Sequence, residues 1–276
     1  MKASDLFIKC LEAEGVEYIF GIPGEETLEV INSISKSTIE FIITRNEQGA
    51  AFMADMYGRI TGKPGVCLAT LGPGATNLMT GVANAHLDRS PIIAITGQTE
   101  LMNQHRESHQ YIDTIQLFSP ITNYNQRIMV PSTIPDIIRK AFATNEQNPG
   151  AVHIQLPSDV AKVVVGTDLI PLSKSIISRS IIDKQQFQIA EDLIKNAKNP
   201  IILAGNGVIR DGAWNELKAF IEKTNLPMVN TFMAKGILPF NHKRNLFTIG
   251  GATYANLKHP LDTADLVIAI GFDIVE

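Results

Sequence analysis

Residues 44–59 read T-R-N-E-Q-G-A-A-F-M-A-D-M-Y-G-R, and this stretch decides how the first half of the chain is organised. The apolar run 39–43 leads straight into it, which predicts a strand and then a helix that begins near Glu47. The small and apolar side chains of this helix fall on two faces: Ala50, Met53, Ala54 and Tyr57 on one, and Gly49, Phe52, Met56 and Ile60 on the other. Because a helix that is apolar nearly all round needs cover, we expect it in a core or an interface, with Glu47 at a buried edge. The alternative is an ordinary first-turn acid, stabilised by the helix dipole.

The composition is that of a globular protein long enough for two domains. Of the 276 residues, 45% are hydrophobic and 19% are charged, and the net charge is −4. This balance favours neither a nucleic-acid partner nor an anionic membrane. The two cysteines, Cys10 and Cys67, lie in separate apolar runs and form no disulfide framework. With no stretch typical of a signal peptide or a membrane span, we expect a cytoplasmic protein.

Strands and helices alternate along the first 160 residues. The expected strands are short and almost wholly apolar, and they lie at 18–20, 39–43, 66–70, 91–96 and 151–156. Strands of this kind are buried on both faces, which predicts an α/β fold with a parallel sheet and helices on both sides.

A second α/β unit follows the first. We expect the first domain to span 1–160 and residues 161–182, which lose helical periodicity, to form an extended linker. The second domain, 183–276, has an expected helix near 185–197 and strands at 200–204 and 264–270. Because it stops on a core strand, we expect it to be incomplete.

Two glycine-proline turns follow predicted neighbouring strands. G-I-P-G occupies 21–24 and G-P-G occupies 72–74, with Asn77 as a side-chain donor just beyond. Such turns at the ends of parallel strands would converge on one crevice, where α/β sheets bind ligands. Each alone is equally consistent with a plain tight turn. G-N-G-V-I-R at 205–210 has Arg210 in place of the third glycine of a dinucleotide fingerprint, so it is either a strand–helix turn or a nucleotide contact.

A set of collinear motifs resembles the thiamine diphosphate-dependent enzymes, most closely the acetolactate synthase large subunits. The runs are G-I-P-G at 21–24, R-N-E-Q-G-A-A-F-M-A at 45–54, Y-G-R-I-T-G-K-P-G-V at 57–66, L-G-P-G-A-T-N-L at 71–78, H-Q-Y-I-D-T at 109–114, L-P-S-D-V at 156–160 and A-D-L-V-I-A-I-G at 264–271. The resemblance covers the whole chain and implies a domain that binds the pyrimidine ring of the cofactor, followed by a Rossmann-like central domain.

The resemblance also implies roles for individual residues. Glu47 corresponds to the catalytic glutamate that hydrogen-bonds the aminopyrimidine ring and relays a proton, and Gln110 to a glutamine near the reacting carbon. The remaining cofactor-binding positions are Pro23, Gly24, Thr70, Pro73 and Asn77. The implied substrate is a 2-keto acid, with two pyruvates giving 2-acetolactate. No metal ligands are expected in the chain, because none of its Cys/His sets has metal-ligand spacing.

The family pattern and this sequence differ in two respects. Family members are about twice as long, and their third domain holds Mg²⁺ and the diphosphate through a G-D-G motif that does not occur here. The resemblance therefore implies an N-terminal part, inactive when isolated, of a homodimeric or homotetrameric enzyme. In addition, G-F-D-I-V-E at 271–276 lacks the arginine with which the flavin-containing type contacts FAD, so FAD is doubtful. Another decarboxylase or acetyltransferase of the superfamily, or a non-catalytic nucleotide-binding module, stays open as an alternative.

Overall fold

The chain forms two compact units in a computed structural model that describes residues 1–104, 106–174, 181–250 and 260–274. The first unit spans 1–177 and the second spans 178–276. Each unit is built around its own parallel sheet, and each is described by itself below.

A six-stranded sheet organises the first unit. Its strands lie in the order β2-β1-β3-β4-β6-β5, and all of their pairings are parallel. Their bounds are β1 Tyr18–Gly21, β2 Glu40–Ile43, β3 Gly65–Ala69, β4 Ile92–Gln98, β5 Tyr124–Arg127 and β6 Ala151–Pro157. β3, β4 and β6 are buried throughout, as expected for central strands covered on both faces.

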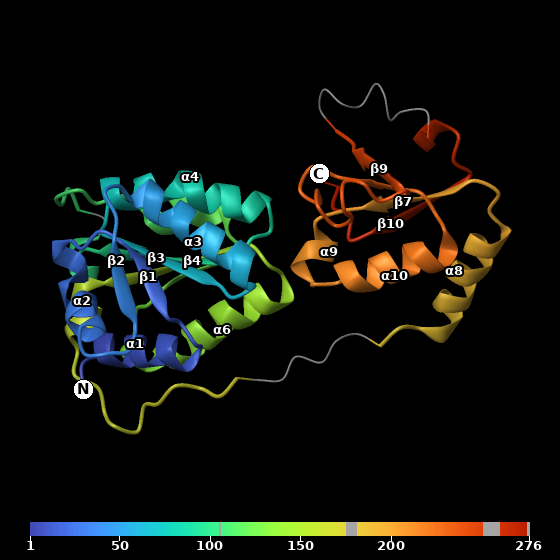
Figure 1. The fold of residues 1–276 in the computed structure, drawn as a ribbon. Coiled ribbons are helices and arrows are strands. Elements are labelled where there is room, and N and C mark those ends of the chain that lie inside the picture. The colour runs from blue at the N-terminus through green and yellow to red at the C-terminus, as the bar shows by residue number, and fades with distance from the viewer. Residues whose placement is uncertain (105, 175–180, 251–259, 275–276) are drawn as a thin grey trace. The chain divides into compact units, whose positions relative to one another are not determined.

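Helices cover both faces of this sheet (Figure 1). One face packs against α1 (Ala3–Ala13), α2 (Leu28–Ile34), α6 (Ile134–Gln147) and α7 (Ser158–Lys162). The other packs against α3 (Glu47–Thr61), α4 (Pro73–Leu87) and α5 (Thr114–Phe118). Short 3-10 turns, Glu25–Thr27, Leu101–Asn103, Ser119–Ile121 and Pro131–Thr133, complete the unit. The predicted parallel sheet with helices on both sides is thus confirmed.

A polar network around a buried ion pair of α3 joins this helix to α4. Asp55 is almost fully buried and accepts two hydrogen bonds from Arg59, at 2.8 and 3.0 Å. Arg59 also donates to Asp88 at 2.7 Å, and Asn84 donates to Asp55 at 2.8 Å. The helices approach closely because Gly81 has no side chain: a Cβ there would lie 2.6 Å from that of Ala51. Close packing and this network together fix α3 on α4.

The start of the expected linker belongs to the first unit. Ala161 is fully buried within α7, and the Val165 amide donates to the Met1 carbonyl at 2.9 Å. The Ala3 amide donates to the Val163 carbonyl at 2.8 Å, so this segment pairs with the N-terminus. Residues 175–180 of the expected linker lie outside the described residues.

The second unit has a four-stranded parallel sheet in the order β10-β7-β8-β9. Its elements are α8 (Lys184–Asn196), β7 (Pro200–Ala204), α9 (Gly207–Arg210), α10 (Trp214–Thr224), β8 (Met228–Asn230), β9 (Asn245–Thr248) and β10 (Leu266–Ile270). Its core includes Ile202, Leu217, Ile221 and Met228. Residues 275–276, the end of the run that bears on FAD, lie outside the described residues.

Among the described helices, none is both long enough and apolar enough to cross a lipid bilayer.

A buried histidine occupies the middle of β6. The His153 ring stacks on Phe118 with 4.2 Å between ring centroids, and it has no exposed surface. Its Nδ1 lies 2.7 Å from Asn125 Oδ1 and its Nε2 lies 2.8 Å from Thr96 Oγ1. Asn125 Nδ2 donates to the Ile115 carbonyl at 2.5 Å, so its Oδ1 is the acceptor and Nδ1 carries the proton. Burial lowers the pKa of His153 to about 3, which keeps the ring neutral.

Replacing Asp55 should destabilise the first unit strongly. Asp55→Ala leaves the Arg59 guanidinium with Asp88 alone and Asn84 without its acceptor, which costs about 1–3 kcal/mol of unfolding free energy. Urea unfolding followed by circular dichroism measures this loss. Lys63→Ala, which removes the exposed Lys63–Glu17 pair, is the control and should change the stability little. Equal losses in the two variants would contradict the role of the buried pair.

Acid should weaken the first unit through His153. Between its ordinary pKa of 6.5 and its folded value of about 3, the unfolded chain binds a proton that the folded chain does not. The free energy of unfolding should therefore fall by about 1.4 kcal/mol per pH unit as the pH drops through this window. His153→Gln, which cannot titrate, should reduce that slope. Fluorescence of Trp214, the single tryptophan, reports the unfolding of the second unit separately in the same samples. If the free energy of unfolding of the first unit had the same pH dependence in His153→Gln as in the unaltered chain, this assignment would be contradicted.

Candidate functional site

The candidate site lies where β1, β2 and β3 end. These strands are neighbours and run parallel, so the turns that follow them meet at one edge of the sheet. The turns bring three segments together: Gly24 after β1, Glu47 after β2, and Thr70 with the start of α4 after β3.

Glu47 is the first residue of α3, and its carboxylate is held by α4. Asn46 caps the helix by accepting a hydrogen bond from the Gln48 amide at 2.8 Å. Asn77 Nδ2 donates to Glu47 Oε2 at 2.9 Å. A Cβ on Gly74 would lie 3.4 Å from Glu47 Oε1, so that oxygen lies over a residue without a side chain. One carboxylate oxygen is therefore fixed by an amide, and the other lies beside Gly74.

Thr70 connects the β1 turn to the start of α4. A Cβ on Gly24 would lie 2.7 Å from Thr70 Cβ, and a Cβ on Gly74 would lie 2.9 Å from Thr70 Cγ2. Thr70 Oγ1 donates a hydrogen bond to Glu26 Oε2. Gly24, Thr70, Gly74, Asn77 and Glu47 thus form one continuous set of contacts.

The other predicted residues lie at the rim. Pro23 and Pro73 are exposed, Pro73 as the first residue of α4. Gln110 is also exposed, and it has a φ of 55°. Its backbone lies against Gly72, where a Cβ would come within 2.3 Å of the Gln110 carbonyl oxygen. Gln110 thus lies beside the start of α4, and the described residues show no hydrogen bond from it to Glu47.

The outer face of α3 is open in the single chain. We expected cover all round, and its inner residues Ala50, Ala51 and Ala54 are indeed fully buried. The outer side chains are exposed instead: Phe52 by 37%, Met53 by 42%, Met56 by 51% and Ile60 by 78%. Glu47 is accordingly half-buried rather than enclosed. Any cover for this face has to come from outside the first unit's own core.

The residues present suit the pyrimidine ring of thiamine diphosphate. A carboxylate can hydrogen-bond a ring nitrogen, and Asn77 fixes its orientation. Because Gly24 and Gly74 have no side chain, Thr70 packs directly against both turns, and Glu47 lies beside the second of them. Among the described residues, no group of three or more His, Cys, Asp and Glu side chains could hold a metal ion. The site thus suits the organic ring.

Sequence reasoning missed two polar residues near the site. Glu26 contacts Thr70, and its signal was an acid placed two residues after the Gly/Pro turn. Gln98 ends β4 with its side chain fully buried, and it donates to the Ile112 carbonyl at 3.0 Å. A polar residue closing an otherwise apolar strand could have drawn attention to it.

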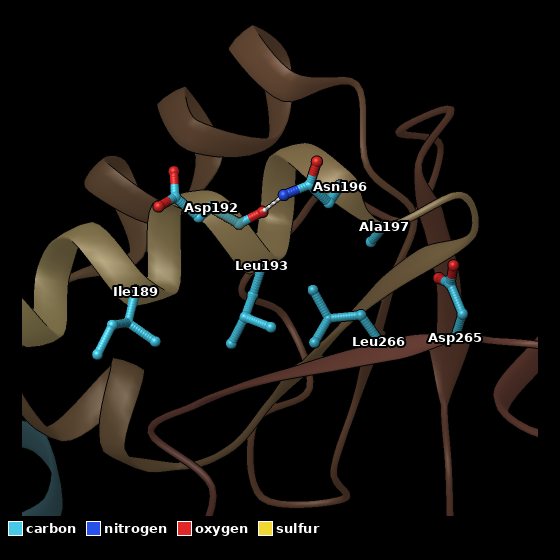
Figure 2. Close-up of a pocket in the computed structure, with 7 residues that line it drawn as sticks. All are labelled: Ile189, Asp192, Leu193, Asn196, Ala197, Asp265 and Leu266. Carbon is cyan, nitrogen blue, oxygen red and sulfur yellow. Dashed lines mark hydrogen bonds between the residues drawn. The ribbon is translucent and has the colours of Figure 1, made fainter.

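The second unit has a pocket of a different character (Figure 2). Its volume is about 510 Å³, and it is lined by Ile189, Asp192, Leu193, Asn196, Ala197, Asp265 and Leu266. Ile189 and Leu193 of α8 and Leu266 of β10 give it an apolar floor, and Asn196 is engaged with the Asp192 carbonyl. The G-N-G turn is a strand–helix turn in which the Gly207 amide donates to the Gly271 carbonyl at 2.8 Å. None of the predicted site residues lies in this unit.

Two family models match the chain. Residues 1–117 match the N-terminal TPP-binding domain of thiamine pyrophosphate enzymes, and residues 187–276 match the central domain of the same enzymes. The first range contains every predicted site residue.

Curated relatives match over nearly the whole chain. Probable acetolactate synthase large subunits of Methanococcus aeolicus and Methanocaldococcus jannaschii are each 40% identical over 98% of this chain. The acetolactate synthase isozyme 1 large subunit of Escherichia coli is 35% identical over 97% of this chain. The match covers 46%, 47% and 48% of these three relatives, so the chain spans about half their length. On this evidence the chain belongs to the thiamine pyrophosphate enzymes, of which it carries the N-terminal and central domains.

Proposed function

We propose that this chain is the pyrimidine-binding and central part of a thiamine diphosphate-dependent acetolactate synthase. The observation that carries the proposal is the Glu47 carboxylate, oriented by Asn77 and placed beside Gly74 where three parallel strands end. Relatives named acetolactate synthase large subunit support the choice of reaction, the decarboxylating union of two pyruvates.

In this proposal Glu47 holds and passes a proton. When bound, the cofactor supplies an electron sink for the decarboxylation of a 2-keto acid. Glu47 would share a proton with the ring nitrogen, and Asn77 would keep Oε2 occupied so that the other oxygen does this work. Pro23, Gly24, Thr70 and Pro73 would line the ring, while Gln110 at the rim would face the substrate.

The proposal assigns the cation to the part of the family that this chain does not match. Mg²⁺ accompanies the diphosphate, and the described residues offer no cluster for it. The isolated chain should then bind the cofactor weakly and turn over no pyruvate. We further propose that the chain is closer to the FAD-independent type, since the run 271–276 has no arginine. The two buried, free cysteines are consistent with a cytoplasmic location.

We also propose that a second copy covers the outer face of α3. Phe52, Met53, Met56 and Ile60 form an uncharged apolar strip, which suits a two-fold contact with an identical strip. Because α3 begins at Glu47, cover on this helix would also exclude water from the site. A dimer built this way is the smallest assembly; a tetramer would pair two of them.

Removal of the Glu47 carboxylic acid should abolish most of the activity. The test fuses residues 1–276 to the remaining half of the Methanococcus aeolicus relative, and we expect the fusion to form 2-acetolactate from pyruvate. Glu47→Gln should lower its rate about 10²- to 10⁴-fold, the usual worth of a positioned acid–base group.

Two controls make this result specific. Glu40→Gln changes an exposed acid on the neighbouring strand and should leave the rate unchanged. Calorimetry on the fusion compares the binding of thiamine diphosphate plus Mg²⁺ with the binding of FAD and of ADP. This comparison separates a thiamine enzyme from a nucleotide-binding module. Near-normal turnover of Glu47→Gln would refute its role, and a different product from pyruvate would point to another enzyme of the superfamily.

A charge on the α3 strip should separate the subunits. Met56→Glu places a carboxylate at the centre of the proposed contact, so sedimentation should show a shift from dimer to monomer. Ile170→Glu is the control, since Ile170 is more exposed than Met56, at 65% against 51%, and lies far along the chain from α3. A monomer at all concentrations for the unaltered chain, or a dimer that survives Met56→Glu, would contradict the proposed interface.

A further inference from the structure

A polar stripe crosses one face of the first unit's sheet next to the candidate site. The stripe consists of Thr96 and Gln98 on β4, His153 and Gln155 on β6, and Asn125 and Arg127 on β5. Strand register places them on one face, since Thr96 pairs with Gln155, and Asn125 with His153. The same face carries small apolar residues at Ala94 and Ala151, so the change to polar residues occurs within single strands. Buried polar groups need partners, and their partners show what the stripe does.

Three amide side chains of the stripe donate hydrogen bonds to one short segment of the chain, two of them to backbone carbonyls and one to a side-chain hydroxyl. Gln98 Nε2 donates to the Ile112 carbonyl at 3.0 Å, and Asn125 Nδ2 donates to the Ile115 carbonyl at 2.5 Å. Gln155 Nε2 donates to Thr114 Oγ1 at 2.5 Å. We call Gln98, Asn125 and Gln155 the amide clamp. Three strands thus hold three residues of the short segment 112–115.

The side-chain oxygen of each clamp residue also accepts a hydrogen bond, which fixes the amide from its other end. Gln98 Oε1 accepts from the Thr99 amide at 2.9 Å, and Asn125 Oδ1 accepts from the neutral His153 ring at 2.7 Å. Gln155 Oε1 accepts from Arg127 Nε. With both ends of each amide occupied, the clamp has one orientation.

The clamped segment leads directly to Gln110. Only Tyr111 separates Gln110 from Ile112, and the Gln110 backbone lies against Gly72 with a φ of 55°. A non-glycine residue at positive φ persists only where its surroundings hold it. Gly72 restrains one side of Gln110, and the clamp restrains the chain that leaves it.

We propose that the amide clamp is a set of positioning residues that holds Gln110 at the rim of the site, in the place where it meets the substrate. The proposal rests on the function given above to Gln110, but the clamp itself is a structural claim that can be tested separately. None of the three amides reaches Glu47 or Asn77 through the hydrogen bonds of the described residues, so the clamp acts on Gln110 and not on the cofactor end of the site.

One chemical change, amide to carboxylate, separates the clamp from a general effect on stability. Gln98→Glu and Asn125→Asp replace a donor by an acceptor opposite a backbone carbonyl, which can only accept. Gln155→Glu faces Thr114 Oγ1, a hydroxyl that can reverse and donate, and its new charge faces Arg127. We therefore expect the first two to release the segment and the third to keep it.

Hydrogen exchange on the 276-residue chain tests the positioning. In Gln98→Glu and Asn125→Asp, the backbone amides of residues 110–117 should exchange at least about 10-fold faster through local opening. In Gln155→Glu, their exchange rates should be unchanged. Exchange in α3 should stay as in the unaltered chain in all three. Unchanged exchange of 110–117 in Gln98→Glu, or equal release in all three variants, would overturn the clamp.

Kinetics of the fusion enzyme test the consequence for the substrate. Gln98→Glu should lower kcat/KM for pyruvate about 10- to 100-fold through misplacement of Gln110, with the concentration of thiamine diphosphate for half-activation unchanged. Added to Gln110→Ala, it should cause little further loss, because the two act as a unit. A full additional loss would overturn the positioning role. If exchange responds as expected but Gln110→Ala has normal kinetics, the clamp stands and the assigned role of Gln110 fails.

Discussion

Parallel pairing of the strands is the constraint on which this site depends. When β1, β2 and β3 run the same way side by side, the turns after them must meet at one edge, although they lie at residues 24, 47 and 70 of the chain. No single turn makes a site. Gly24, Thr70, Gly74 and Glu47 contact one another because the strands that precede them end at the same edge of the sheet.

Close helix packing then fixes the carboxylate within that edge. Glu47 belongs to α3 and its partner Asn77 to α4, so their 2.9 Å hydrogen bond is only as constant as the spacing of the two helices. Gly81 lets the helices approach, and the hydrogen bonds from Asn84 to Asp55 and from Arg59 to Asp88 oppose sliding of one helix along the other. The charged network near the end of α3 thereby supports the geometry at its beginning.

Much of this could be predicted from the sequence, and the failures have physical causes. Strands such as β3, β4 and β6 can be recognised in the sequence because a strand buried on both faces is apolar along nearly its whole length. β5 was missed because Tyr124–Arg127 is polar: it lies at the sheet edge, and Asn125 and Arg127 serve the polar stripe. Likewise β8 and β9 are short and were not recognised. Glu47 and Asn77 were singled out from the helix pattern and the G-P-G turn, and the resemblance added their roles, whereas the contact of Glu26 with Thr70 depends on how the turn after β1 folds.

The polar stripe has a consequence for the dynamics of the first unit. Where Ala94 gives way to Thr96 and Gln98, the sheet face exchanges apolar burial for hydrogen bonds, whose net contribution is smaller because water can replace them. The short helix α5 rests on this part of the sheet through Phe118, Thr114 and little else that is fully buried. We therefore expect α5 to form a small cooperative segment that can open while the α3–α4 layer stays folded.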